Sequence, residues 1–319
     1  MKIWTILDLI EWTEGYFEES GLETPRLDAE VLLGFVLEKS RLQLYLNFEM
    51  PVFPDQLIAY RELVKKRRNH TPVSYLTNCR EFMSLNFYVD QRVLIPRPET
   101  ENLVEYVLDQ PERANYSTSK LVDIGTGSGA IAVSLAVNRP NWEITATDIS
   151  KDALTVAEIN AIRHGAQDQI NFQQGNLLKA VANSKVTFDW IVSNPPYVSY
   201  RQYEKLQPDV HNYEPRLALV SGQDGLQLIR QLISDAPLFL KPEGKLAIEI
   251  GYGQRQAVEE LAHLLTMAGT EVGSVTHIGQ DWAKEKIVIG NVLSVEPHPN
   301  ADRLNLPTID LGNDNVVKV

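Results

Sequence analysis

The stretch VDIGTGSG, residues 122–129, follows an apolar run and precedes a helical pattern of apolar residues. Its glycines, Gly125, Gly127 and Gly129, are spaced G-x-G-x-G, unlike the G-x-G-x-x-G of dinucleotide-binding turns. Glycine suits a backbone that turns sharply or touches a ligand, and the following helix offers free N–H groups to a polar ligand. A tight strand-to-helix turn without a ligand would give the same pattern, so the turn alone leaves both interpretations open.

The chain around this turn alternates β-rich and helical segments. Strands are predicted at residues 120–125, 143–148, 170–176, 188–194, 244–251, 271–278 and 285–296. Helices are predicted at residues 129–139, 150–165, 225–240 and 254–269. This alternation predicts an α/β fold with a mostly parallel, doubly wound sheet and helices on both faces. Ligands of such sheets bind at the carboxyl ends of the strands.

Two polar residues end the second and third of these strands. Asp148, at the first position, can accept hydrogen bonds from both ribose hydroxyls of an adenosyl group, or it can cap the helix that follows. Many adenosyl-binding folds carry an acid at the second position, which accepts from the adenine amino group. Asn176 stands there in this chain, and its carboxamide oxygen can accept without charge.

The fourth strand ends in Asn194-Pro195-Pro196-Tyr197, at the same sheet edge as the glycine turn. Prolines cannot donate to a sheet ladder, so the strand must stop here. The Asn194 side-chain oxygen and the Pro195 carbonyl can each accept one hydrogen of a planar NH₂ group, held rigidly for attack on a methyl donor, and Tyr197 offers a flat stacking face. Alternatively, Asn194 caps its own turn and Tyr197 belongs to the core. The motif itself does not choose between an amide and an adenine.

Residues 1–78 are predicted to form a small helical domain. Apolar residues recur at helical spacing over residues 5–19, 28–39 and 56–68, and the last segment ends in the basic cluster Lys65–Arg68. Residues 79–95 are predicted as a β-hairpin linker, because they are rich in β-branched and aromatic residues. The α/β domain then covers residues 96–290, and residues 291–319 form a separate tail.

Composition narrows the class of protein. The formal net charge of −12 argues against coating nucleic acid nonspecifically, because that mode of binding neutralises phosphates. Cys79 is the single cysteine, so an intrachain disulfide is excluded and a reducing cytoplasm is expected. The N-terminus lacks the apolar core of a signal peptide, and the sequence has no run of about 18 apolar residues that would span a membrane.

Four blocks, in the family's order, resemble the HemK/PrmC-type release-factor glutamine methyltransferases. They are LIPRPETE (94–101), DIGTGSGAIAVSLA (123–136), SNPPYV (193–198) and YEPRLALVSGQDGL (213–226). The resemblance runs from the N-terminal helices to about residue 290. N-P-P-Y alone would equally fit DNA adenine-N6 methyltransferases, and LIPRPETE separates the chain from these and from ribosomal-protein glutamine methyltransferases. Both remain the alternatives.

The resemblance implies a Rossmann-like class I methyltransferase domain with S-adenosylmethionine as the methyl donor. The acceptor would be the side-chain amide nitrogen, N5, of the glutamine in the Gly-Gly-Gln loop of class 1 peptide chain release factors. The helical domain would contact the release factor, with Lys65–Arg68 either assisting or forming a solvated helix end. A monomer in the cytoplasm is expected, with no metal, no membrane and no stable nucleic acid partner.

The resemblance also assigns site residues. The catalytic residues would be Asn194, Pro195, Pro196 and Tyr197. The cofactor-binding residues would be Asp123, Gly125, Thr126, Gly127, Gly129, Asp148, Asn176 and Asn194. The substrate-binding residues would be the same four motif residues together with Arg97, Pro98, Glu99 and Thr100.

The chain departs from the family pattern in two places near the hairpin and at its C-terminus. Asn78 and Ser84 stand where the family usually has glycine, which predicts altered loop geometry there. The block SVEPHPNADRLNLPTIDLG, residues 294–312, resembles the start of the tRNA-binding OB-fold of the phenylalanyl-tRNA synthetase β subunit. About 30 residues cannot complete a five-stranded barrel, so we expect at most a hairpin that binds no tRNA, without a metal role for His298.

Overall fold

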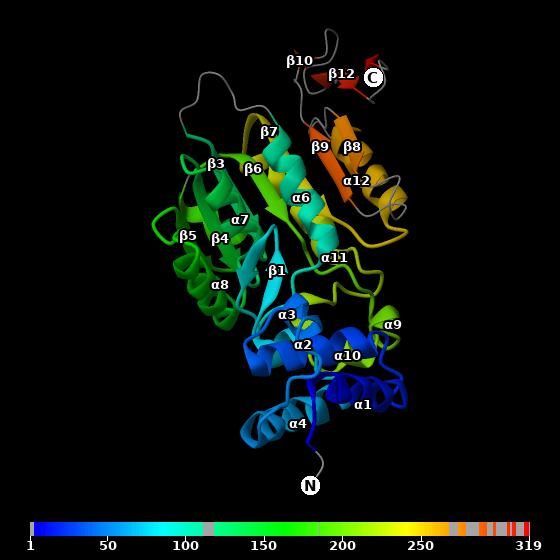
Figure 1. Cartoon of the computed structure of the whole chain (residues 1–319). Helices are drawn as coiled ribbons and strands as arrows, with labels where there is room; N and C mark the ends of the chain where they lie inside the picture. The colour runs from blue at the N-terminus through cyan, green and yellow to red at the C-terminus, as the bar shows by residue number, and fades with distance from the viewer. Residues whose placement is uncertain are drawn as a thin grey trace. The chain divides into compact units, whose positions relative to one another are not determined.

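The computed structural model of the 319-residue chain is drawn in Figure 1. It describes residues 3–110, 118–184, 186–267, 274–278 and 287–291, with further strands at 296–297, 305–306, 308–310 and 316–318. The chain forms two compact units. The first comprises Met1–Cys79, Val89–Gln91 and Leu206–Glu214, and the second comprises Arg80–Tyr88, Arg92–Lys205 and Pro215–Val319. None of the helices in the described ranges is long and apolar enough to cross a membrane.

The first unit is helical, as predicted. Its helices are α1 (Ile6–Glu18), α2 (Pro25–Leu37), α3 (Arg41–Tyr45), α4 (Pro54–Arg68), α5 (Val73–Thr77) and α10 (Pro208–His211). The three longest were predicted, whereas α3 and α5 have five residues each, too few to show a helical period. Thr5 and Asp8 form a capping box that starts α1. Apolar residues from the helices and their connections form one core, which includes Ile6, Ile10, Phe17, Leu32, Leu33 and Leu44, all fully buried.

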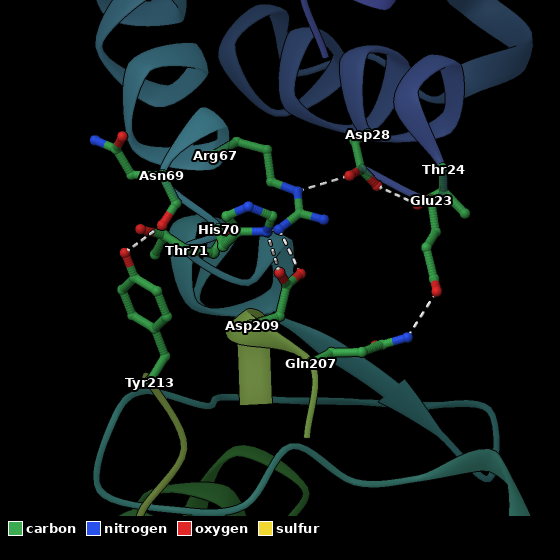
Figure 2. A network of polar contacts seen from close by, with 10 residues as sticks. All are labelled: Glu23, Thr24, Asp28, Arg67, Asn69, His70, Thr71, Gln207, Asp209 and Tyr213. Atoms are coloured by element: carbon green, nitrogen blue, oxygen red, sulfur yellow. Dashed lines mark hydrogen bonds and ion pairs between the residues drawn. The ribbon is translucent and has the colours of Figure 1, made fainter. Parts of the chain in front are cut away.

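Residues 206–214 belong to this first unit although the sequence around them belongs to the second. Figure 2 shows how polar contacts fix the segment: Arg67, at the end of α4, lies between Asp28 of α2 and Asp209 of α10. Its Nε donates to Asp28 Oδ2 at 2.6 Å, and its Nη1 donates to Asp209 Oδ2 at 2.5 Å. Nδ1 of His70 lies 2.9 Å from the other oxygen of Asp209.

Arg67 is therefore not part of a solvated helix end. Its side chain is 6% exposed, so the interpretation of Lys65–Arg68 as a solvated helix end is wrong for Arg67. The outer ends of the segment are also held, because Gln207 donates to Glu23 at 2.6 Å and the Tyr213 hydroxyl donates to the Asn69 carbonyl at 2.7 Å. We call these residues, with Asp28, Arg67, His70 and Asp209, the Arg67 network.

The predicted hairpin is present and occupies the first part of the predicted range, residues 79–95. Strands β1 (Arg80–Phe82) and β2 (Leu85–Phe87) pair antiparallel, with Met83 and Ser84 at the turn. Val89–Gln91 lie outside it. Both turn residues have positive φ, 49° and 59°, and so does Asn78, at 50°. Glycine adopts this conformation without steric cost, which is a backbone reason for the glycines that the resemblance leads one to expect at positions 78 and 84.

The second unit contains a seven-stranded sheet, which confirms the predicted α/β fold (Figure 1). The strands are β3 (Lys120–Ile124), β4 (Glu143–Asp148), β5 (Ile170–Gln174), β6 (Phe188–Ser193), β7 (Leu240–Glu249), β8 (Ser274–Ile278) and β9 (Ile287–Asn291). Their order is β5-β4-β3-β6-β7-β9-β8. The pairs from β5 to β7 are parallel, and β9 is antiparallel to both its neighbours.

The helices of this unit are α6 (Pro98–Asp109), α7 (Ala130–Asn138), α8 (Lys151–Arg163), α9 (Tyr200–Tyr203), α11 (Gln227–Asp235) and α12 (Arg255–Met267), with 3₁₀ turns at Leu177–Ser184, Arg216–Ala218 and Ala236–Leu238. Helix α6 precedes the first strand of the sheet, and the other helices of this unit lie in the connections between its strands, where a parallel sheet requires crossovers. The apolar side of α11 packs with residues of β3, β6 and β7 in one core that includes Val122, Ile191, Ile229, Leu232 and Ile248. The central strand β6 is buried along its whole length.

The tail contains more strands than expected. Strand β10 (Glu296–Pro297) pairs antiparallel with β11 (Asn305–Leu306), and β12 (Thr308–Asp310) pairs with β13 (Val316–Lys318). Two short ladders are present, so the prediction of at most one hairpin is wrong. His298 lies outside the described residues, and the likeness to an OB-fold stays a prediction.

Candidate active site

The strand register brings three predicted strand ends together at one edge of the sheet. Ile124, the last residue of β3, pairs with Thr147 of β4 on one side and with Ser193 of β6 on the other. The next residue on each strand is therefore Gly125, Asp148 or Asn194. The order of the strands changes direction at β3, which places this edge at the switch point where doubly wound sheets bind ligands.

The glycine turn has the backbone that its sequence requires. Gly125, Gly127 and Gly129 have φ values of 72°, 56° and 81°. A Cβ on Gly129 would lie 3.0 Å from Ala157 Cβ of α8, so this glycine is needed for packing. A Cβ on Gly125 would meet nothing within 4 Å, and one on Gly127 only the Gly125 carbonyl at 4.0 Å. The first two glycines therefore border open space before the N-terminus of α7, which fits a ligand cradle.

Asp123 is fully buried beneath this turn. It accepts a hydrogen bond from the Thr126 hydroxyl at 2.6 Å. The Thr126 side chain is therefore directed at Asp123. Burial raises the pKa of Asp123 to about 7, and the negative charge of Asp148 adds to the increase. The carboxyl therefore titrates near neutral pH, and a nearby cation would favour its charged form.

Asp148 accepts two backbone hydrogen bonds at the end of β4. Gly127 N–H donates to Oδ2 at 2.9 Å, and Ser150 N–H donates to Oδ1 at 2.8 Å. Ser150 caps α8, so the alternative in which Asp148 caps that helix is wrong. Burial raises the pKa of Asp148. Each carboxylate oxygen has more than one acceptor position, so Asp148 can still accept hydroxyl groups of a ligand.

The Asn-Pro-Pro-Tyr motif is joined to α6 and β7 by a chain of hydrogen bonds. Asn194 Nδ2 donates to Thr100 Oγ1 at 2.9 Å, and Thr100 Oγ1 donates to Glu249 Oε2 at 2.7 Å. The Tyr197 hydroxyl donates to the other oxygen, Glu249 Oε1, at 3.2 Å. Asn194 therefore bonds a side chain that lies 94 positions away in the sequence, not the backbone of its own turn. We call Asn194, Thr100, Tyr197 and Glu249 the Glu249 network.

Tyr197 stays protonated within this network. Burial raises the pKa of its phenol, and the negative charge of Glu249 raises it further. The charge of Arg97 lowers the pKa of the phenol and that of Glu99 raises it. The ring of Tyr197 is half-buried and packs against the core of the second unit.

Sequence reasoning missed Glu249 and Gln254, the residues that support the motif from the end of β7. Gln254 donates to the Tyr197 carbonyl at 2.9 Å and accepts from Gly251 N–H at 2.9 Å. A Cβ on Gly225 would lie 2.2 Å from the Tyr197 carbonyl oxygen, so the chain also approaches the motif closely there. One signal was present: Glu249 is a charged residue inside the apolar run KLAIEI, and it is 1% exposed.

The remaining predicted residues lie at the start of α6 and after β5. Arg97 is the N-cap residue of α6 and Pro98 its first residue, while Thr100 is buried within the Glu249 network. Asn176 is exposed in the loop that follows β5. The strand ends bring the glycine turn, Asp148 and Asn194 together, and the ligand-binding roles assigned to all these residues stay predictions.

Two family models match the chain. Residues 8–77 match the PrmC N-terminal domain, and residues 100–209 match the methyltransferase small domain. The structure is similar to the hMettl16 catalytic domain solved in complex with MAT2A 3′UTR hairpin 6, with a TM-score of 0.53 and 18% identity over 71% of this chain and 81% of that one. At this identity the likeness shows the fold alone.

Curated relatives are more similar in sequence. The release factor glutamine methyltransferase of Geobacter sulfurreducens is 42% identical over 81% of this chain and 88% of that protein. The one from Rhodopirellula baltica is 42% identical over 77% of this chain and 84% of that protein, and the one from Chlorobaculum tepidum is 40% identical over 89% and 95%. This chain therefore belongs to the release factor glutamine methyltransferase family, which makes it an S-adenosylmethionine-dependent protein glutamine methyltransferase.

Proposed function

We propose that the protein transfers a methyl group from S-adenosylmethionine to N5 of the glutamine in the Gly-Gly-Gln loop of class 1 peptide chain release factors. The observation that carries the proposal is the placement of Asn194 beside the glycine turn and Asp148, with its amide nitrogen bound to Thr100. A site built in this way can accept an N–H group next to a ligand bound at the turn. The family membership supplies the release factor as the partner.

The turn and the two acids suit the cofactor. Gly125 and Gly127 leave open space along their backbone, and Asp148 can accept ribose hydroxyls. Asp123, buried behind Thr126, favours a cation at the turn once it is ionised. When bound, S-adenosylmethionine would supply an electrophilic methyl group on a sulfonium cation. Asn176 remains a proposed neutral acceptor for the adenine amino group.

The motif residues suit the amide acceptor. An amide nitrogen is a poor nucleophile because its lone pair is delocalised, so the site must orient it rather than deprotonate it first. The Asn194 side-chain oxygen and the Pro195 carbonyl would each accept one hydrogen, which leaves the face of the nitrogen directed at the methyl group. Tyr197, protonated and held by Glu249, offers its ring to the flat amide.

The family membership supports the proposed partner, and the monomeric state and the setting are part of the same proposal. The helical first unit would contact the release factor, and the enzyme would act as a monomer in the cytoplasm without a stable nucleic acid partner. Arg97, Pro98 and Glu99 at the start of α6 would border the substrate.

The test uses the full-length protein, labelled S-adenosylmethionine and two acceptors, a purified class 1 release factor and duplex DNA containing adenine. Label should enter the release factor and not the DNA. Asn194→Ala should abolish transfer and leave the affinity for the cofactor nearly unchanged. Label in the DNA alone would overturn the proposal, and loss of cofactor binding in Asn194→Ala would contradict the role given to Asn194.

A further inference from the structure

Glu249 is a buried carboxylate whose two oxygens are bound by two different hydroxyl groups. Oε2 accepts from Thr100 at 2.7 Å and Oε1 accepts from Tyr197 at 3.2 Å, and the residue is 1% exposed at the end of β7. An ionised carboxylate can only accept hydrogen bonds. Both hydroxyl protons must therefore point towards Glu249, so that the carboxylate sets the direction of each hydrogen bond around it.

Thr100 passes this direction on to Asn194. Its single hydroxyl proton is bound by Glu249, so Thr100 Oγ1 can only accept from its next partner. Nδ2 of Asn194 lies 2.9 Å from Oγ1 and is a donor. The opposite orientation of the carboxamide would set two acceptors against each other inside a buried network, which costs free energy. Because the carboxamide is planar, its Oδ1 must then point away from Thr100.

We propose that Glu249 is a positioning residue which, through Thr100, makes Asn194 Oδ1 the atom that receives the substrate, so that the site selects an N–H group over an oxygen. This inference rests on the proposed function, because it specifies how the same site holds an amide. A carboxylate or ester oxygen in that place would meet Oδ1 as a second acceptor, and the site would reject it. The selection depends on hydrogen-bond direction and not on the size or charge of a pocket.

The matched pair Thr100→Val and Thr100→Ser tests this role. Valine keeps the size of threonine and removes the hydroxyl, so the Asn194 carboxamide loses the partner that fixes its orientation. We expect kcat with a release factor to fall about 100-fold, the cost of a misplaced reacting group, while the KM for the release factor and the Kd for S-adenosylmethionine change less than about twofold. Thr100→Ser keeps the hydroxyl and should restore kcat to within about threefold of the unsubstituted protein.

A second set of variants tests whether Glu249 acts through Thr100. Glu249→Gln removes the charge that binds both hydroxyl protons and should lower kcat at least about tenfold. In the double variant with Thr100→Val, Glu249→Gln should lower kcat little further, because the connection is already broken. Cofactor affinity and thermal unfolding of each variant show that the fold is intact.

The outcomes separate this inference from the proposed function. If the unsubstituted protein methylates the release factor and Thr100→Val is as active as Thr100→Ser, the positioning role is wrong and the proposed function stands. The role would also be overturned if Thr100→Val and Thr100→Ser lowered kcat by the same factor. The same holds if the kcat of the double variant fell by the product of the two single losses. If the unsubstituted protein does not methylate the release factor, the proposed function fails on its own.

Discussion

Each unit of the molecule contains a polar network with a buried charged side chain at its centre, Arg67 in one and Glu249 in the other, and the two networks differ in their partners. In the Arg67 network a guanidinium lies between Asp28 and Asp209, so opposite charges are paired (Figure 2). In the Glu249 network a single carboxylate binds two hydroxyl groups, and the connection ends on a neutral amide. The first holds a segment of chain in place, whereas the second fixes the direction of hydrogen bonds.

The difference follows from what each partner can do. A guanidinium carries only N–H donors, arranged in a fixed fork, and binds two carboxylates strongly. The direction of each of its hydrogen bonds is therefore always the same. A hydroxyl group can donate and accept, so its role is set by its neighbour. A charged pair therefore suits the anchoring of residues 206–214, and a carboxylate with hydroxyl partners suits a site that must present an acceptor to a substrate.

The largest effect is expected from Arg67→Met, which breaks the first network and leaves the second unchanged. Methionine fills much of the same space but leaves Asp28 and Asp209 without their cation. Removing one partner of a buried ion pair costs about 3–5 kcal/mol, so the free energy of unfolding measured in denaturant should fall by that amount. The Kd for the cofactor, for which we propose a site in the second unit, should stay within about twofold in the folded variant.

Arg68→Met is the matched control for that experiment. Arg68 is the next residue of α4, but its guanidinium lies at the surface over the Tyr16 ring and bonds the Tyr16 and Ser20 hydroxyls. Its loss should cost no more than about 1 kcal/mol. If the two variants lose equal stability, the Arg67 network is not an anchor.

Asp123 extends the comparison, since it is a buried carboxylate bound by the Thr126 hydroxyl, and no Lys or Arg within the described parts of the chain forms an ion pair with it. Its pKa is raised from the usual 3.8 to about 7. Between pH 3.8 and about 7 the folded protein therefore holds a proton that the unfolded chain has released. The empty protein should therefore lose stability as pH rises through that window. A cationic cofactor favours the carboxylate, so its affinity should rise with pH below 7 by up to about tenfold per unit.

Calorimetric titration with S-adenosylmethionine from pH 5.5 to 8 checks this expectation. Asp123→Asn cannot ionise at that position, so its affinity should be lower at pH 8 and nearly independent of pH. An equally steep pH dependence in Asp123→Asn would assign the titration to another group, with Asp148 as the next residue to test.

The smallest effect is expected from Tyr197→Phe, which removes one branch of the Glu249 network. The ring remains for stacking, and Thr100 still donates to Glu249, so Asn194 keeps its orientation. A hydrogen bond to a charged group contributes about 1.5–3 kcal/mol to stability, but this loss does not act on Asn194, so kcat should fall less than about tenfold. A loss as large as that of Thr100→Val would show that the phenol itself takes part in holding the amide.

The glycine turn, Asp148 and the Asn-Pro-Pro-Tyr motif could be predicted from the sequence because their information is local. Each follows directly after a predicted strand, and the parallel arrangement brings the strand ends together without further knowledge. Alternation of strands and helices likewise predicted the sheet. The exact turn of the hairpin was not predicted, because Met83 and Ser84 adopt a backbone conformation that their side chains disfavour.

The contacts that support the site could not be predicted, because they depend on pairing between distant segments. Thr100 and Glu249 lie 149 positions apart, and they meet only once α6 and β7 are placed in the folded unit. Arg67 and Asp209 lie 142 positions apart, and no local pattern indicates that residues 206–214 belong to the first unit while the residues on either side belong to the second. A charged residue in an apolar strand, such as Glu249, indicates a special role, but its partners cannot be identified from the sequence.

The most direct test of the central claim is to locate the methyl group by mass spectrometry. A class 1 release factor is incubated with S-adenosylmethionine and the unsubstituted protein, Asn194→Ala or Thr100→Ser, and its peptides are fragmented. We predict one added methyl group on the side-chain nitrogen of the Gly-Gly-Gln glutamine with the unsubstituted protein and Thr100→Ser, and none with Asn194→Ala. A methyl group on another residue, or the same product from Asn194→Ala, would contradict the account.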